Sequence, residues 1–366
     1  MPIDIASIQH TTAFWAFVLS MFFGAVTQRS NFCTMGAISD VASFGDWTRA
    51  RMAITSIGVA IVGVAALKAT GTVDMSKSFY IAPKLVWLSH IVGGLAFGFG
   101  MTLASGCGSK TLIRVGSGSL RALVTIMVMG IFAWFTLRGI LGVFRVWALD
   151  SVAVTLSTTQ DLPTLVGLSG NAASIAAALF GVALLVFAFA GKEFRADHWN
   201  WIGGMVVGLT VIAAWYVSGR VGFVAEHPDT LEAAWVATNS GRPESLSFTA
   251  PPAYLIELLG YWSDKSRFLS FGVATALGVV AGSFLMSVFT KSFRWEGFAT
   301  TEDLGNHLAG AALMGFGGVT ALGCTVGQGL SGMSTLALGS FITVAFIVVG
   351  CRLALAYQTW RLDHAA

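Results

Sequence analysis

The sequence has 366 residues, of which 55% are hydrophobic and only 11% are charged, and its formal net charge is +3. A soluble domain carries about 25% charged residues, so this composition excludes an ordinary water-soluble globular protein. The small positive charge gives no reason to expect nucleic acid as a partner, because Lys and Arg are common in the loops of membrane proteins. We therefore expect a protein embedded in a lipid bilayer.

Long apolar segments recur along the whole chain, and a helix needs roughly 20 mostly apolar residues to cross the hydrocarbon layer of a bilayer. Backbone groups in lipid must bond to one another, and no strand-like alternation is present, so the sequence predicts an all-α polytopic membrane protein. We expect about nine transmembrane helices, with short half-helices and re-entrant loops between them. In chain order the predicted spans are Ala13–Val26, Met52–Leu67, Leu85–Leu103, Leu120–Val143, Ala173–Ala190, Trp201–Val217, Phe268–Phe289, His307–Leu322 and Leu336–Ala356.

Three short segments between these spans are rich in Gly, Ser and Thr and carry too little charge for aqueous loops. They contain Cys33, Cys107 and Cys324. Each segment is interpreted as a break in a helix followed by a short helical piece. Irregular backbone at membrane depth is tolerated only where protein buries it or where it lines a cavity, and broken helices point to the site in many transporters. The three cysteine loops are therefore the predicted site.

Two longer hydrophilic segments, Asp150–Asn171 and Arg220–Pro252, are predicted to be aqueous loops, and the second contains prolines that break helices. The first lies near the middle of the chain. We interpret residues 1–366 as a single transmembrane transport domain, with a first repeat half at 1–150 and a second at 172–366.

An internal repeat underlies this division. A shift of 217 residues aligns His90 with His307 and Cys107 with Cys324. Five predicted spans separate the starts of the two repeated units, and an odd number inverts the second unit relative to the first. We therefore predict a pseudo-two-fold, inverted repeat. The same shift also aligns Gly93 with Gly310, Gly98 with Gly315, Gly100 with Gly317, Gly106 with Gly323 and Ser117 with Ser334.

The residues around the three cysteines suit an anion that contains sulfur. Glycine allows close approach of the backbone to a ligand, and the start of each short helix offers unpaired N–H groups to an anion. Thiols are weak, polarisable hydrogen-bonding groups, and several weak contacts in succession would hold an anion with a terminal sulfur without trapping it. The predicted transport residues are Cys33, Cys107, Cys324, Arg29, Asn31, Gly106, Gly108, Lys110, Thr111, Arg114, Gly323, Thr325 and Gln328.

Other conspicuous residues are interpreted as packing residues. Cys351 lies in an apolar segment without a break, where a cysteine behaves as a small hydrophobic residue. Gly93 and Gly98 are expected to allow close helix packing, and His90 and His307 to pack at helix starts. The four cysteines form no CxxC pair, so neither a metal site nor a disulfide framework is expected.

The loops Arg29–Cys33, Gly106–Arg114 and Gly323–Gly332 closely resemble the signature loops of the YeeE/YedE family of thiosulfate transporters, and the resemblance covers nearly the whole chain. It implies an hourglass-shaped protein that takes up thiosulfate across a bacterial inner membrane, past three cysteines of which Cys107 is the most central. It also implies a small TusA-like cytoplasmic sulfurtransferase as a partner. No enzymatic activity and no cofactor are expected, and some relatives are linked to selenium or to other sulfur species.

Two other functions stay open on the residues alone. The first is a membrane-embedded sulfurtransferase with a persulfide on Cys107, whose thiolate Lys110 and a helix N-terminus would favour, although the sequence shows no adjacent general base. The second is a channel for soft metal ions that uses the thiolates, which the basic residues beside two of the loops argue against.

Overall fold

The computed structural model describes residues 4–264 and 266–364, and these residues are almost entirely helical, which confirms the predicted all-α class. The long helices are α1 (Ile5–Ser30), α3 (Thr48–Ala69), α4 (Trp87–Leu103), α6 (Leu120–Arg138), α9 (Gly170–Phe189), α11 (His198–Tyr216), α13 (Phe271–Phe289), α14 (Thr301–Thr320) and α15 (Leu338–His364). The shorter helices are α2 (Thr34–Phe44), α5 (Gly108–Gly116), α7 (Ile140–Arg145), α8 (Leu162–Leu165), α10 (Lys192–Ala196) and α12 (Ala250–Gly260).

The remaining elements are short. Two 3₁₀ turns are η1 (Met75–Lys77) and η2 (Phe79–Ile81), and three π-helical segments are η3 (Val146–Asp150), η4 (Val217–Val221) and η5 (Gly327–Gly332). The strands form two antiparallel pairs, β1 (Lys84–Leu85) with β2 (Val154–Thr155), and β3 (Phe223–Val224) with β4 (Ala234–Trp235).

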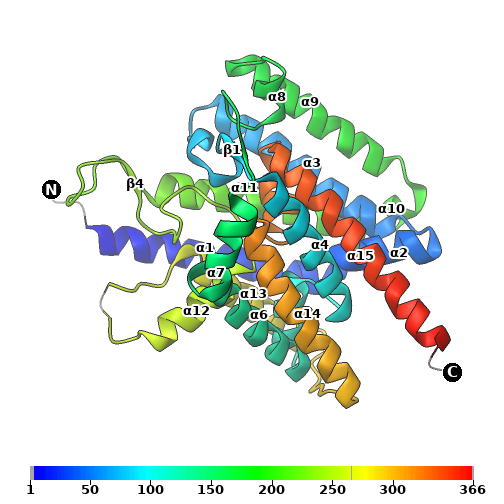
Figure 1. The fold of residues 1–366 in the computed structure, drawn as a ribbon. Helices are drawn as coiled ribbons and strands as arrows, with labels where there is room; N and C mark the ends of the chain where they lie inside the picture. The colour runs from blue at the N-terminus through cyan, green and yellow to red at the C-terminus, as the bar shows by residue number, and fades with distance from the viewer. Residues whose placement is uncertain (1–3, 265, 365–366) are drawn as a thin grey trace.

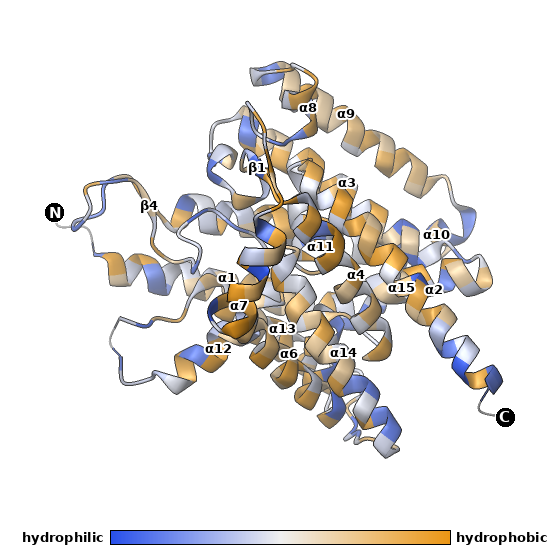
Figure 2. Ribbon diagram, viewed as in Figure 1, coloured by the Kyte–Doolittle hydropathy of each residue, from blue (hydrophilic) through white to orange (hydrophobic). Residues whose placement is uncertain are grey.

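Eight helical segments of the described chain are long and apolar enough to cross a membrane. The remaining predicted span, His307–Leu322, corresponds to α14, which has 20 residues but begins with Glu302 and Asp303. The predicted span Leu120–Val143 ends too late, because Gly139 separates α6 from α7. Apolar residues dominate the long helices, whereas polar residues gather at helix ends and in loops (Figure 2). The protein is therefore a multi-pass membrane protein.

Helices α4 and α14 run antiparallel against each other in the middle of the bundle (Figure 1). A Cβ atom added to Gly93 would lie 2.7 Å from the carbonyl oxygen of Gly317, and one added to Gly310 would lie 2.5 Å from that of Gly100. Small residues allow such close backbone approach between membrane helices. The packing role predicted for Gly93 is thus confirmed. The shift of 217 residues aligns Gly93 with Gly310 and Gly100 with Gly317, so the two contacts are reciprocal.

The other long helices pack around this central pair. Helix α4 also packs on α15, where Gly98 contacts the carbonyl oxygen of Ile347. Helix α14 packs on α6, where a Cβ on Gly315 would lie 2.5 Å from the carbonyl oxygen of Met129. Helix α1 packs on α13 and α11 packs on α3, while α9 lies at the periphery against α3 (Figure 1).

Three residues interpreted as packing residues make helix–helix or local contacts. Cys351 is fully buried in α15, and its Sγ accepts a hydrogen bond of 3.1 Å from the Thr102 hydroxyl of α4. His90 Nδ1 lies 2.8 Å from the hydroxyl oxygen of Thr343 in α15, and His307 Nδ1 lies 2.8 Å from the carbonyl oxygen of Asp303. Cys351 and His90 thus pack between α4 and α15, whereas His307 lies in the second turn of α14 and bonds within its own helix.

The prediction that Arg220–Pro252 is an aqueous loop is wrong at its C-terminal end. Leu246, Phe248 and Thr249 are each no more than 1% exposed. The segment folds inward because distant partners satisfy its polar groups: the Ser331 hydroxyl donates to the carbonyl oxygen of Leu246 at 2.7 Å. The prolines that follow begin α12 at its first turn and do not prevent a helix there.

Candidate functional site

The three cysteine loops share one backbone construction. The residue two positions before each cysteine has a left-handed conformation, with φ of 53° at Asn31, 55° at Ser105 and 60° at Leu322. Such angles are uncommon outside glycine and cost free energy, so they mark a backbone that the surrounding structure holds in place. Each turn ends one helix, as predicted from the sequence; Cys33 and Cys107 then cap α2 and α5, whereas Cys324 lies three residues before η5.

Two of the thiols accept hydrogen bonds from backbone N–H groups. Cys33 Sγ accepts from Gly36 N at 3.3 Å. Cys324 Sγ accepts from both Gly327 N and Phe248 N at 3.3 Å. Because the sulfur serves as acceptor in these contacts, the S–H proton of each thiol is available to donate to another group.

Cys107 differs from the other two thiols, because it caps α5 without a backbone donor to its sulfur. Its Sγ lies 3.2 Å from the Ser109 hydroxyl oxygen, and its carbonyl oxygen accepts from the Thr111 hydroxyl at 3.0 Å. Thr111 is therefore bonded within its own helix. The Cys107 side chain is 1% exposed.

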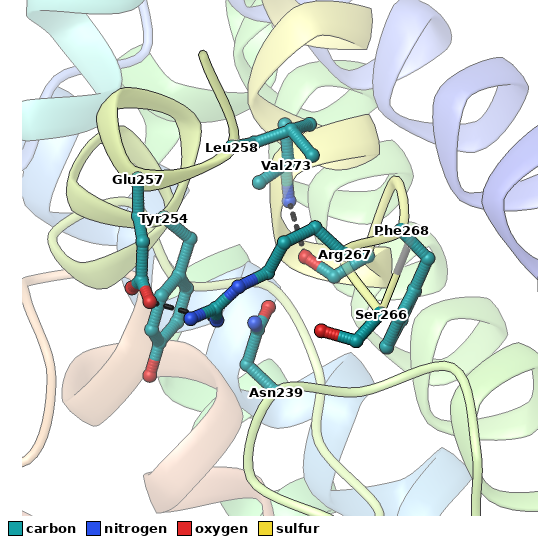
Figure 3. A pocket seen from close by; sticks show the side chains of 9 residues that line it. Asn239, Tyr254, Glu257, Leu258, Ser266, Arg267, Phe268 and Val273 are labelled. Atoms are coloured by element: carbon teal, nitrogen blue, oxygen red, sulfur yellow. Dashed lines mark hydrogen bonds and ion pairs between the residues drawn. The ribbon is translucent and has the colours of Figure 1, made fainter. Parts of the chain in front are cut away.

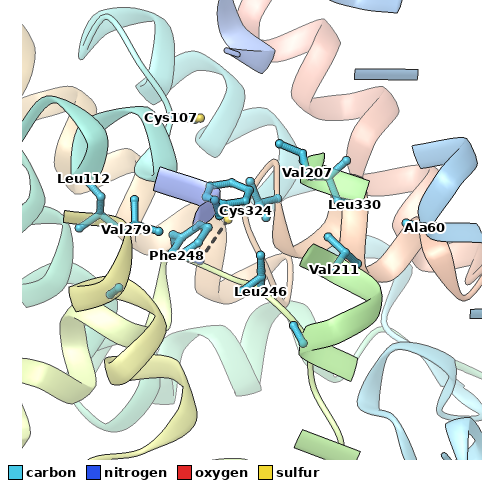
Figure 4. Close-up of a cluster of buried hydrophobic side chains, with 14 of the residues drawn as sticks. Ala60, Cys107, Leu112, Val207, Val211, Leu246, Phe248, Val279, Cys324 and Leu330 are labelled. Atoms are coloured by element: carbon cyan, nitrogen blue, oxygen red, sulfur yellow. Dashed lines mark hydrogen bonds between the residues drawn. The ribbon is translucent and has the colours of Figure 1, made fainter. Parts of the chain in front are cut away.

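Phe248 connects the loops of Cys107 and Cys324. Its N–H donates to Cys324 Sγ, and its carbonyl oxygen lies 3.0 Å from the position of a Cβ on Gly108. Cys107 and Cys324 belong to one buried cluster that also contains Phe248 and Leu112 (Figure 4). A side chain on Gly108 would crowd this carbonyl, so a glycine suits the point where the two loops meet.

Two basic residues follow Cys107 on α5. The half-buried Lys110 side chain packs on Gly106, with its Cγ 3.4 Å from the position of a Cβ there. Arg114 Nη1 donates to the carbonyl oxygen of Ser105 at 2.8 Å. Among the described residues, neither Lys110 nor Arg114 has a carboxylate within ion-pair distance. Their charges are therefore available to an anion beside α5.

Arg29 packs on another helix. Its guanidinium lies 4.9 Å from the ring centre of Trp199, at the exposed end of α1. Arg49, whose Nη1 lies 3.3 Å from Asp40 Oδ2, also approaches the loop: a Cβ on Gly36 would lie 2.7 Å from Arg49 Nη1 and 3.6 Å from Cys33 Sγ. Arg49 is not evident as a site residue from the sequence, because it lies beyond α2 and returns to the loop only through the turn into α3.

The polar residues of the Cys324 loop face different surroundings. Gln328 is engaged at both ends of its amide, with Nε2 donating to the carbonyl oxygen of Ala321 at 2.6 Å and Oε1 accepting from Ser340 at 2.5 Å. It braces the loop. The Thr325 hydroxyl has no partner within the described structure and lines an apolar cavity of 390 Å³ between α2, α3 and α15. Gly323 has φ 156° and lies against the backbone of Gln328.

A cavity of 270 Å³ lies on the side of Gly323 that faces the 222–249 loop, and Arg145, Glu244, Ser247 and Thr249 are among its lining residues. This cavity brings polar groups of the loop next to the Cys324 turn. Glu244, Ser247 and Thr249 are not among the predicted site residues, because the Arg220–Pro252 segment resembles an aqueous loop in sequence.

A smaller cavity of 60 Å³ lies beside α12 (Figure 3). Its floor is an ion-pair network in which Glu257 accepts from Arg138 at 2.8 Å and from Arg267 at 2.7 Å. Glu257 is 5% exposed, and a buried carboxylate requires such partners. We interpret this network as structural, because all three charges are paired.

Metal binding finds no support in the arrangement of side chains. Within 4–264 and 266–364, no group of three or more His, Cys, Asp or Glu side chains is placed to hold a metal ion.

Comparison with known proteins gives concordant matches. Residues 29–353 match the family described as Sulphur transport. The chain is similar to the thiosulfate transporter TsuA of Escherichia coli K12, with 27% identity over 89% of each chain. It is similar to TsuA of Spirochaeta thermophila, with 27% identity over 91% of this chain and 95% of the relative. A shorter match of 24% identity covers 49% of this chain and 42% of the probable transporter YedE of Salmonella typhimurium.

Proposed function

The chain belongs to the Sulphur transport family, and from this premise we propose that it takes up thiosulfate across a bacterial inner membrane. Two relatives that align along most of its length are named thiosulfate transporters, and the resemblance of its loops to the YeeE/YedE family points the same way. The observation that carries the proposal is that three thiols inside a membrane protein each follow a left-handed turn that ends a helix.

The chemistry of the thiols suits the terminal sulfur of thiosulfate. At Cys33 and Cys324, backbone N–H groups donate to the sulfur atom. The S–H group of each thiol is then left to donate to the anion. An S–H donor is weak and a terminal sulfur is a weak, polarisable acceptor, so each contact releases the anion readily. Conduction requires such successive weak sites. Because Cys107 and Cys324 are buried, passage requires side chains such as Phe248 to move.

The proposed direction follows from the placement of charge. The face that holds the C-terminal end of α1, the start of α3 and the end of α15 carries more Lys and Arg than the opposite face of the described chain. Cytoplasmic loops carry the excess of Lys and Arg. We therefore place Cys33 toward the cytoplasm and Cys324 toward the outside. A TusA-like sulfurtransferase would meet the anion on the Cys33 side.

We further propose that the two repeat halves, 1–150 and 172–366, are inverted copies. The reciprocal contacts of Gly93 with Gly317 and of Gly310 with Gly100 support this relation, because a two-fold axis makes equivalent positions exchange partners. The pairing of α4 with α15 and of α14 with α6 follows the same rule. The axis would lie in the membrane plane, between α4 and α14.

Uptake of labelled thiosulfate into proteoliposomes tests the function, with sulfate, sulfite and selenite as competitors. We expect uptake that excess unlabelled thiosulfate removes and that sulfate leaves mostly intact. Equal competition by sulfate would contradict recognition through a terminal sulfur. Mass spectrometry of Cys107 after exposure to thiosulfate distinguishes a transporter, which keeps an unmodified thiol, from a sulfurtransferase, which accumulates a persulfide.

A further inference from the structure

The cavity beside the Cys324 turn contains hydroxyl groups without partners. The Tyr80 side chain is 4% exposed and that of Thr249 is 1% exposed, and neither hydroxyl has a hydrogen-bond partner within the described chain. Both residues line the 270 Å³ cavity. A buried hydroxyl without a partner is costly, so two of them in the residues that wall one cavity indicate a ligand with hydrogen-bond acceptors.

The position of these hydroxyls relates them to the thiol. The Tyr80 hydroxyl oxygen lies 3.5 Å from the position of a Cβ on Gly327, and the N–H of Gly327 donates to Cys324 Sγ. The Arg145 guanidinium also lines the cavity, where its Nε lies 3.1 Å from Asp150 Oδ2. An anion in this cavity would therefore have hydroxyl donors and an arginine around it and the Cys324 loop beneath it.

Glu244 lines the same cavity and has an unusual environment for a carboxylate. It is half-buried, and its Oε2 accepts one hydrogen bond of 3.0 Å from the Ser240 hydroxyl. Its backbone N–H donates to the Ser218 hydroxyl oxygen at 3.2 Å, which fixes the position of the residue. No Lys or Arg of the described chain lies within ion-pair distance of its carboxylate.

The ionisable groups around Glu244 do not neutralise it. Tyr80 of η2, Tyr254 of α12 and Arg145 of α7 share its cavity, and Arg145 is paired with Asp150. Burial raises the pKa of Glu244 to about 7, against the opposing effect of the hydrogen bond from Ser240. Beyond Tyr254, Glu257 is paired with Arg138 and Arg267, and Cys324 lies on the far side of Tyr80.

We propose that this cavity binds a divalent oxyanion together with a proton: the Tyr80 and Thr249 hydroxyls donate to its oxygens, and Glu244 takes up one proton as the anion enters. The physical reason is that a dianion and a carboxylate in one partly buried cavity repel each other strongly unless the carboxylate is neutral. By linkage, anion binding and protonation of Glu244 then favour each other equally. The inference rests on the proposed function, since thiosulfate is the dianion that we expect here.

The test is equilibrium binding of thiosulfate to the purified full-length protein between about pH 5.5 and 8.5, where thiosulfate itself remains a dianion. Wild-type affinity should fall about tenfold per pH unit above the pKa of Glu244, as linkage of one proton requires. Glu244→Gln should abolish this dependence and keep the affinity that the wild type shows at low pH. Glu226→Gln, an exposed carboxyl of the same loop, serves as the matched control and should retain the wild-type profile.

Because histidines also titrate in this range, only the part of the slope that Glu244→Gln removes is assigned to Glu244. The hydroxyl donors are tested separately. Tyr80→Phe and Thr249→Val should each weaken binding several-fold at every pH without changing its slope. Wild-type affinity that is independent of pH, or a slope that survives in Glu244→Gln, would overturn the proton assignment. Unchanged affinity in the double variant of Tyr80 and Thr249 would overturn the anion assignment.

Uptake into proteoliposomes, measured at pH 6 and at pH 8, separates the two proposals. Thiosulfate uptake that does not vary with pH refutes only the binding of the anion together with a proton in this cavity. Absence of any thiosulfate uptake refutes the proposed function itself.

Discussion

Replacing Lys110 by Met should weaken the capture of thiosulfate next to Cys107. The two residues are one helical turn apart at the start of α5, and side chains so spaced have Cβ atoms about 5–6 Å apart. At a separation of about 6 Å and an effective dielectric constant of about 20, one unit of anion charge gains about 3 kcal/mol from an ammonium group. Because Lys110 is only half-buried, solvent screening reduces this to about 1–2 kcal/mol, or roughly tenfold in affinity.

The assay is the initial rate of labelled thiosulfate uptake at concentrations well below half-saturation. Lys110→Met should lower this rate about tenfold at low ionic strength, with a smaller difference at high salt because salt screens the charge. Lys110→Arg should retain most of the rate. Lys192→Met removes an exposed lysine from the same face of the protein and should behave as the wild type. A Lys110→Met variant that transports normally at low salt would refute the electrostatic role of this residue.

Three further predictions concern the surroundings of the site. Gly282→Ala places a methyl group on the carbonyl oxygen of Met21 and should lower thermal stability by about 1–3 kcal/mol. Gly260→Ala, which places its methyl group in open space, should not lower it. Equal melting temperatures of the two variants would contradict the packing of α1 on α13. Glu257→Gln weakens two ion pairs and should lower the free energy of unfolding by about 1–3 kcal/mol in a denaturation experiment. The uptake affinity should stay unchanged, and a changed affinity would give this network a transport role. Arg49→Met should reduce uptake more than Arg29→Met does, and the reverse order would restore the sequence-based assignment.

The sequence predicted those parts of the site that depend on local pattern. Segments rich in Gly, Ser and Thr around Cys33, Cys107 and Cys324 predicted the helix breaks, and the structure confirms a helical piece after each cysteine. The packing role of Gly93 followed from the same reasoning, since a glycine in an apolar helix has few other uses in a membrane.

The parts that escaped prediction depend on contacts between distant segments. The burial of Phe248 is decided by its hydrogen bond to Cys324, and that of Leu246 by Ser331. The segment itself contains Ser, Thr and Pro and is typical of a loop. A contact with a distant segment also decides the position of Arg29. This residue precedes Cys33 in sequence, but its guanidinium lies over the ring of Trp199 on another helix.

The central claim is that a buried thiol contacts the anion as it crosses the membrane, and Cys107→Ala tests it most directly. The matched control is Cys351→Ala, because Cys351 is equally buried, loses the same atoms and lies in the α4–α15 packing. With both variants present in the membrane at wild-type amounts, thiosulfate uptake into proteoliposomes should be lost in Cys107→Ala and retained in Cys351→Ala. Wild-type uptake by Cys107→Ala would contradict the account.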